Sequence, residues 1–250
     1  MSIDRTLFKE FRFPDDIILE GYRGSISHGV YVKEGYDDKD VFGIFIPTKE
    51  YIIGLKQYDH YESIKNEWDV LYYSLKKFVS LALKGNPNVL CLLWLNQNFY
   101  TQITPIGQKL IDNRDIFTSK ACHASFVGYA YGQLRRMEKF GKMSHMGAKR
   151  KELVDKFGYD PKHGSHCLRL LKMGVEYLTT GELNVFRDVD KQMLLAVKMG
   201  EWPLEKIKEE ADRLFKLADE ALVRSPLAVK PDYDKANQLL IDLTEEYWYE

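Results

Sequence analysis

The sequence has little of several features that mark specialised classes of protein. It contains three cysteines in 250 residues and almost no net charge, with 36 Lys and Arg against 37 Asp and Glu. Three scattered cysteines exclude a disulfide framework and a CxxC-type zinc site. The longest uninterrupted apolar run, Val89–Leu95, is far shorter than the roughly 20 residues that a membrane span needs.

The N-terminal residues lack the apolar core of a signal peptide and carry acidic side chains, which is unlike a transit peptide. Hydrophobic residues make up 45% of the chain and charged residues 29%, values typical of a globular protein. We therefore expect a cytoplasmic protein with no membrane partner. The sequence leaves its oligomeric state open.

The small net charge conceals an uneven distribution. Residues 135–172 contain eleven Lys and Arg against four acids, a balance of +7, whereas residues 201–250 contain thirteen acids against seven bases, a balance of −6. Such stretches are most often solvated helical faces. A basic stretch can also face a polyanion, such as a triphosphate or RNA.

Residue patterns predict strands in the first hundred residues and helices after them, which makes the fold class α+β with a small mixed sheet. Expected strands cover residues 17–21, 41–46 and 61–71, and a helix with apolar spacing follows at residues 75–83. Beyond residue 100, helical spacing dominates. We expect helices at residues 119–139, 161–178, 188–199, 204–223 and 233–248. The sequence thus predicts one domain of strands and helices over residues 1–98 and a helical domain over residues 99–250.

One segment concentrates residues that suit phosphate chemistry. Gly24 and Ser25 follow a predicted strand, and a second glycine, Gly29, comes four residues after the serine. Such a turn exposes backbone N–H groups and a hydroxyl to phosphate oxygens. Asp38 and Asp40 then begin a strand, so that both carboxylates project from one face. Two adjacent carboxylates repel each other unless a cation lies between them, and paired hard oxygen ligands favour Mg²⁺.

A two-metal site needs a third carboxylate from a neighbouring strand. Asp69 lies among apolar residues of the third predicted strand, and Glu67 shares its predicted face. We favour Asp69, because we expect it at the end of the strand that leads into the helix, but the sequence leaves Glu67 as an alternative.

The pattern of Gly24, Ser25 and Gly29 with Asp38, Asp40, Gly43, Ile44 and Phe45 resembles the DNA polymerase beta-type nucleotidyltransferase superfamily. It is most similar to compact bacterial and phage members, and the similarity extends to residues 83–90 and 159–185. Those members have a serine before the first aspartate, where this chain has Asp37. The resemblance therefore covers most of residues 17–190.

The resemblance implies transfer of a nucleoside monophosphate from an NTP to a hydroxyl acceptor, with release of pyrophosphate. Among the NTPs, ATP is the favoured donor. It implies two Mg²⁺ ions bound by Asp38, Asp40 and Asp69, with Asp69 also helping to deprotonate the acceptor. Gly24 and Ser25 would then hold the triphosphate. The resemblance also implies that residues 1–98 form a palm-like nucleotidyltransferase domain and that the helical domain over residues 99–250 closes its active-site cleft.

Further residues are candidates for binding the substrate. His28 lies inside the turn and either contacts a phosphate or covers the turn. Lys162, His163, His166 and Arg169 lie close to one face of a predicted helix, where they form either a solvated basic face or a surface that contacts the triphosphate or the acceptor. Lys162 and His163 are the first to test, followed by Arg169 and Arg187.

Three classes of acceptor are open: RNA 3′ ends, protein hydroxyls and small molecules. The basic middle region favours RNA slightly. Two alternatives from other classes are an inactive nucleotide-binding regulatory module and an antitoxin-like protein that binds a partner through its acidic C-terminal helices.

Overall fold

The computed structural model describes residues 5–33, 36–138 and 148–249. The chain forms two compact units, each assembled from separate stretches of sequence. Unit 1 comprises Met1–Ser27, Asp38–Phe117 and Pro231–Glu250, and unit 2 comprises His28–Asp37 and Thr118–Lys230. The division after residue 98 stays a prediction. The α+β class is confirmed, with a mixed sheet in the N-terminal half and mostly helices after it.

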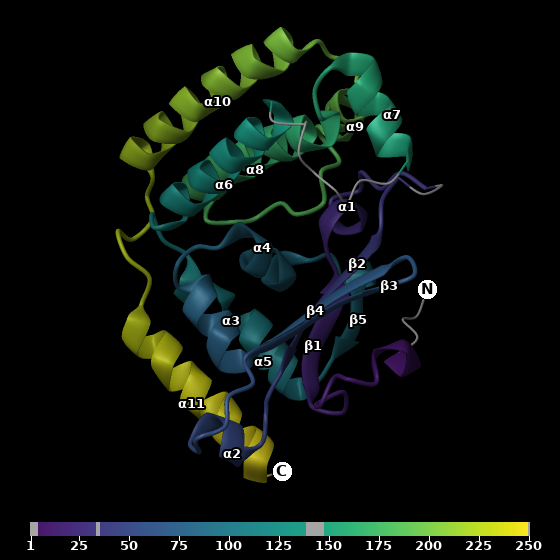
Figure 1. Ribbon diagram of the computed structural model, residues 1–250. Coiled ribbons are helices and arrows are strands. Elements are labelled where there is room, and N and C mark those ends of the chain that lie inside the picture. Colours follow the sequence, from purple (N-terminus) through teal and green to yellow (C-terminus); the bar gives the residue numbers. More distant parts are fainter. Residues whose placement is uncertain (1–4, 34–35, 139–147, 250) are drawn as a thin grey trace. The chain divides into compact units, whose positions relative to one another are not determined.

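Unit 1 contains a five-stranded sheet in the order β3-β4-β2-β1-β5 (Figure 1). The β2–β4 pair is parallel, whereas the β1–β2, β1–β5 and β3–β4 pairs are antiparallel. The strands are β1 (Ile17–Tyr22), β2 (Lys39–Phe45), β3 (His60–Lys65), β4 (Trp68–Ser74) and β5 (Tyr100–Ile103).

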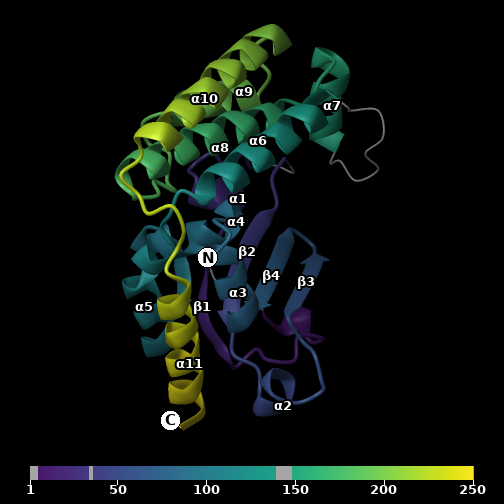
Figure 2. The ribbon, with the colours of Figure 1, turned by 90° about the vertical axis from the view of Figure 1, so that its left-hand side faces the viewer.

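The helices of unit 1 include one that returns from the end of the chain. Helix α11 packs against α3 and α5, and Figure 2 shows it running beside this part of the unit. The α-helices are α1 (Gly24–Ser27), α2 (Lys49–Ile52), α3 (Leu75–Ala82), α4 (Pro87–Leu90), α5 (Pro105–Asp112) and α11 (Tyr233–Tyr249). Short 3-10 helices are η1 (Arg5–Phe8), η2 (Cys91–Trp94), η3 (Gln97–Phe99) and η4 (Arg114–Phe117).

The two faces of the sheet bury different partners, because side chains alternate along each strand. One face holds an aromatic cluster in which Phe11 stacks on Tyr72 with ring centroids 4.6 Å apart. On the other face, Phe42 packs against Phe78 of α3. The buried members of the aromatic cluster are Phe8, Phe11, Phe13, Ile17, Val41, Phe45, Trp68, Val70 and Tyr72.

Unit 2 is built around α8, whose residues contact three other helices of the unit. Asp160 caps the N-terminus of α8 by accepting a hydrogen bond from the backbone N–H of Lys162, and Gly181 ends the helix with φ 77°. Glycine suits this left-handed position because it has no Cβ. The helices are α6 (Cys122–Glu138), α7 (Ala148–Phe157), α8 (Pro161–Thr180), α9 (Lys191–Lys198) and α10 (Leu204–Arg224).

The predicted helices are confirmed to within a few residues at their described ends, whereas the third predicted strand is wrong. Residues 61–71 do not form one strand, because β3 and β4 make an antiparallel hairpin whose turn contains Asn66 and Glu67. Strand β5 was not predicted. The expected end of the helix at residues 119–139, Lys139, lies outside the described residues.

In the ranges that the structure describes, none of the helices combines the length and the apolar character that crossing a membrane requires.

The β3–β4 turn gives a testable prediction. Asn66 has φ 57°, a left-handed conformation that glycine adopts freely and that most L-residues other than asparagine and aspartate avoid. We expect Asn66→Ala to lower the free energy of unfolding by about 1 kcal/mol, whereas Asn66→Gly leaves it unchanged or higher. Urea denaturation of both variants measures the difference. Equal stability of the two variants would contradict this account of the turn.

Candidate functional site

The predicted phosphate turn lies where β1 leads into α1. Gly24 has φ 63°, and a Cβ atom placed on it would collide with the carboxylate of Asp40. Ser25 is buried, and the hydroxyl of Ser27 donates a hydrogen bond to the carbonyl oxygen of Gly24 at 3.1 Å. The left-handed backbone therefore favours glycine at position 24, and any larger residue there would also displace the Asp40 carboxylate. The turn is thus in direct contact with Asp40, which we predict to bind metal.

The parallel pairing of β2 with β4 brings Asp40 beside Asp69. The two residues are direct register partners, and both side chains lie on the sheet face that also carries Phe42. Asp38 immediately precedes β2 and contributes a charge that acts on Asp69. The three acids predicted from the sequence thus lie at or next to the same end of the β2–β4 strand pair.

The reason given for preferring Asp69 over Glu67 is corrected by the structure. Asp69 is the second residue of β4, not the last before the helix, and Ser74 occupies that end. Glu67 lies in the hairpin turn before β4, and its carboxylate accepts from the ammonium of Lys39 at 2.5 Å. The register with Asp40, rather than proximity to α3, is what favours Asp69.

Arg23 is a residue of this site that the sequence analysis missed. Its backbone N–H donates to the carbonyl oxygen of Asp40 at 3.0 Å, and its Nη2 donates to Oδ1 of Asp69 at 3.0 Å. Burial raises the pKa of the Asp69 carboxyl above its usual value, and the Arg23 guanidinium opposes that rise. Nearby negative charges on Glu62 and Asp38 raise the same pKa further. The only sequence signal for Arg23 was its position, as a basic residue directly before Gly24 of the predicted turn.

The donor set fits Mg²⁺ by its chemistry, because three carboxylates from adjacent strand positions are hard oxygen ligands. Over residues 5–33, 36–138 and 148–249, however, no three His, Cys, Asp or Glu side chains are grouped closely enough to hold a metal ion. One oxygen of Asp69, Oδ1, accepts a hydrogen bond from Nη2 of Arg23. A cation bound at that oxygen would have to replace Arg23.

The other predicted substrate-binding residues belong to unit 2 and do not form one exposed face. His28 is buried, and its Nδ1 lies 2.8 Å from the carbonyl oxygen of Val185. Burial, followed by the charge of Arg169, holds the pKa of His28 well below its usual value, so the ring is neutral. This places His28 in the interior of unit 2.

His163 and Arg169 are also buried. Nδ1 of His163 lies 2.6 Å from Oε1 of Gln133, and Nη1 of Arg169 donates to the sulfur of Met173 at 3.2 Å. The pKa of His166 is lowered well below its usual value by burial and by the Arg169 charge. The interpretation of this helix surface as a solvated basic face is therefore wrong for His163 and Arg169.

Lys162 is the partly exposed cation of this group, with 21% of its side chain accessible. Its Nζ lies 2.9 Å from Oδ1 of Asp37, the residue that departs from the superfamily pattern. Asp37 also binds the ammonium of Lys198, whose side chain is 3% exposed. Burial alone would raise the pKa of Asp37, but the charges of the two lysines outweigh burial and lower it. Two cations on one carboxylate leave an excess positive charge, and Lys162 is the accessible one.

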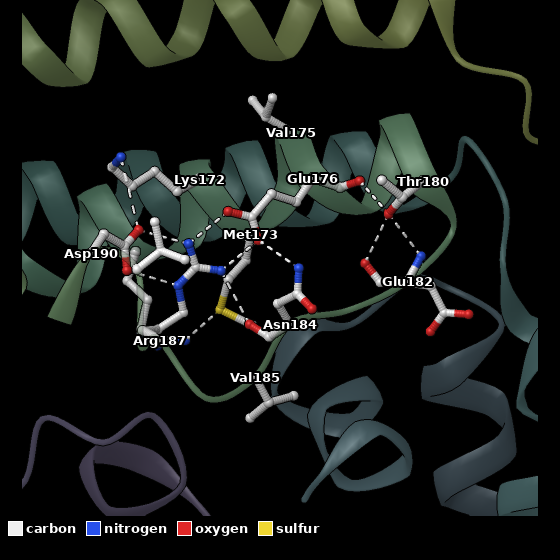
Figure 3. Close-up of polar contacts among 12 residues, drawn as sticks. Lys172, Met173, Val175, Glu176, Thr180, Glu182, Asn184, Val185, Arg187 and Asp190 are labelled. Atoms are coloured by element: carbon white, nitrogen blue, oxygen red, sulfur yellow. Dashed lines mark hydrogen bonds and ion pairs between the residues drawn. The ribbon is translucent and has the colours of Figure 1, made fainter.

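Arg187 is surrounded by carboxylates (Figure 3). Its guanidinium donates to Glu176 at 2.5 and 2.6 Å and to Asp190 at 3.0 and 2.6 Å. Lys172 lies 3.8 Å from the same aspartate. With its side chain 3% exposed, Arg187 fastens the loop after α8 to that helix and is not presented to a substrate.

The collision at Gly24 predicts that Gly24→Ala destabilises unit 1. Because the new methyl group meets both a left-handed φ and the Asp40 carboxylate, we expect a loss of about 1–3 kcal/mol in the free energy of unfolding. Gly128→Ala in α6 is the matched control, since a Cβ there meets nothing within 4 Å. Denaturant titration of both variants measures the effect, and an equally stable Gly24→Ala would contradict this packing.

The carboxylates around Arg187 predict a structural rather than a substrate-binding role. Arg187→Met leaves two negative charges without their partner, and we expect a loss of about 3 kcal/mol in stability. Arg213→Met is the control, because Arg213 pairs with Glu210 on the surface, where such pairs contribute roughly 0–1 kcal/mol. Thermal or urea unfolding distinguishes the two. A stable Arg187→Met protein would show that the loop is held by other contacts.

Comparison with known proteins is consistent with this geometry. The chain matches RlaP, the RNA repair pathway DNA polymerase beta family, over residues 8–242. No curated protein matches the chain. Because the match spans both compact units and includes the turn and all three acids, the chain belongs to the RNA repair pathway DNA polymerase beta family.

Proposed function

We propose that this protein is a Mg²⁺-dependent nucleotidyltransferase that moves a nucleoside monophosphate from an NTP to a hydroxyl acceptor. Family membership suggests nucleotidyltransferase activity in general. The observation that carries the specific proposal is the register of Asp40 with Asp69 beside the Gly24 turn. That arrangement combines paired carboxylates with a phosphate-binding turn at one end of one strand pair.

The proposed reaction forms one bond and breaks one. An acceptor hydroxyl oxygen attacks the α-phosphorus, the bond from that phosphorus to the oxygen of the β-phosphate breaks, and pyrophosphate leaves with the electron pair. The hydroxyl proton passes to Asp69 or to water. The metal would supply a Lewis acid that lowers the pKa of the hydroxyl and neutralises charge on the phosphates.

The chain's own residues position the reactants. Asp38, Asp40 and Asp69 would hold two Mg²⁺ ions, and the Gly24–Ser25 turn would bind phosphate oxygens through its backbone N–H groups. Lys162 of unit 2, whose side chain is partly exposed, would contact the triphosphate or the acceptor. His28, His163 and Arg169 would support that unit from within, because all three are buried.

ATP is the first donor to test, and RNA is the favoured acceptor. The family takes its name from RNA repair, and residues 135–172 carry a charge balance of +7. Residues 139–147 of this stretch lie outside the described ranges. A basic stretch attracts the phosphates of any RNA without reading its sequence. Protein hydroxyls and small molecules remain the alternative acceptors.

The test is label transfer from each α-labelled NTP, in the presence of Mg²⁺ and a cell lysate. We expect Asp38→Asn and Asp40→Asn each to reduce transfer by about a hundredfold or more, because each removes a carboxylate that would hold the metal ions that neutralise charge on the transferring phosphate. Both variants should remain folded, or become more stable, since one carboxylate of a repelling pair is gone. Thermal unfolding checks this point.

Asp115→Asn is the control, because Asp115 is an exposed aspartate in η4, outside the strand pair. Digestion of the products with RNase or protease then identifies the acceptor, and label that survives both digestions indicates a small molecule. Full activity of Asp38→Asn would contradict the site. Nucleotide binding without any transfer would favour the inactive regulatory module, and a stable complex with a basic protein would favour the antitoxin-like alternative.

A further inference from the structure

Arg23 lies at the junction of the phosphate turn and the carboxylates. We propose that it is a positioning residue that holds Asp69 in the metal-free protein, releases it when a divalent cation binds, and then pairs with the triphosphate. The inference rests on the proposed function and adds to it the order in which Arg23 changes partners. Arg23 would pair first with the Asp69 carboxylate and then with the nucleotide.

The geometry fixes the resting state of Arg23. Its backbone is held by the hydrogen bond to the carbonyl oxygen of Asp40, and its guanidinium is held by the 3.0 Å ion pair with Asp69. The two side chains are 25% and 21% exposed, so solvent partly screens the pair. Asp38 and Glu62 add negative charge around Asp69. Arg23 is therefore the guanidinium that offsets a concentration of carboxylates.

A metal ion and Arg23 compete for the same carboxylate. The described residues contain no ready group of three metal-binding side chains, although Asp40 and Asp69 are register partners. Oδ1 of Asp69 already accepts a hydrogen bond from Arg23, so a cation that binds this oxygen meets the Arg23 guanidinium as its competitor. A divalent cation brings twice the charge of a guanidinium and makes shorter contacts with oxygen, so it displaces Arg23 when it binds.

The released guanidinium has a nearby anionic partner when a nucleotide is bound. Arg23 is bonded directly to Gly24, the first residue of the turn that would hold the triphosphate. Its Nε is buried and makes no hydrogen bond to the described part of the protein. Arginine binds phosphate oxygens through two parallel N–H donors. The released side chain can therefore offer a fork of donors to the triphosphate, which the single bond to Asp69 does not use.

The experiment measures Mn²⁺ binding by the full chain without nucleotide, by calorimetry, for the wild type and for Arg23→Gln. Loss of the competing cation should tighten Mn²⁺ binding by roughly tenfold, which corresponds to about 1.4 kcal/mol. Lys39→Gln is the matched control. It also removes one positive charge near this strand pair, but Lys39 pairs with Glu67 and not with Asp69.

A second measurement uses an ATP analogue with a methylene group between the α- and β-phosphorus, which blocks transfer. With Mn²⁺ at saturation, we expect Arg23→Gln to bind this analogue roughly tenfold more weakly than the wild type. Arg23→Lys, which keeps the charge but not the fork, should give intermediate values in both titrations. It also serves as the test variant if Arg23→Gln does not fold, with folding checked by thermal unfolding.

The outcomes separate this inference from the proposed function. If Arg23→Gln binds Mn²⁺ no more tightly than Lys39→Gln, the release of Asp69 is overturned. If the analogue binds equally well, the transfer of Arg23 to the triphosphate is overturned. If the Asp38→Asn/Asp40→Asn double variant keeps full Mn²⁺ affinity, the metal site of the proposed function itself fails, whatever Arg23 does.

Discussion

The parallel hydrogen bonding of β2 to β4 is the constraint on which the candidate site depends. It sets Asp40 opposite Asp69, and a shift of one residue in that pairing would put one of the two carboxylates on the aromatic face of the sheet. The aromatic cluster resists such a shift, because Val41 and Val70 are themselves register partners and are both buried there. The packing of one face of the sheet therefore fixes the position of charged groups on the other. Burial of apolar surface provides the free energy that holds repelling carboxylates side by side.

The strands and helices with strong periodicity could be predicted from the sequence, since β-branched runs and helical spacing are local signals. Strand β5 escaped prediction because its residues, Tyr100–Ile103, pair with β1 across some eighty positions and are all only partly buried. The hairpin at Asn66 was missed for a different reason. The expected alternation of Ile64, Asn66 and Trp68 is that of a continuous strand, and only the left-handed φ of Asn66 reveals the turn.

The acids of the site could be nominated from the sequence, but the cations around them could not. Lys198 lies in an ordinary amphipathic helix, and nothing in its neighbours indicates that it is buried against Asp37. The departure of Asp37 from the superfamily pattern was visible, whereas its compensation by two lysines depends on contacts between residues more than a hundred positions apart. Long-range electrostatics of this kind are absent from any short motif. Their physical effect is to make a buried carboxylate tolerable where a serine is usual.

Unit 1 is built from separate stretches of sequence, and this has a consequence for the synthesis of the protein. Helix α11 covers part of this unit but is encoded after the whole of residues 118–230. At roughly 5–20 residues per second, a ribosome takes about 6–23 s to make those 113 residues. During that interval the sheet and its first helices must exist with an apolar surface still awaiting α11. The nascent chain therefore passes through a stage in which binding by a chaperone, or premature association between chains, competes with completion of the fold.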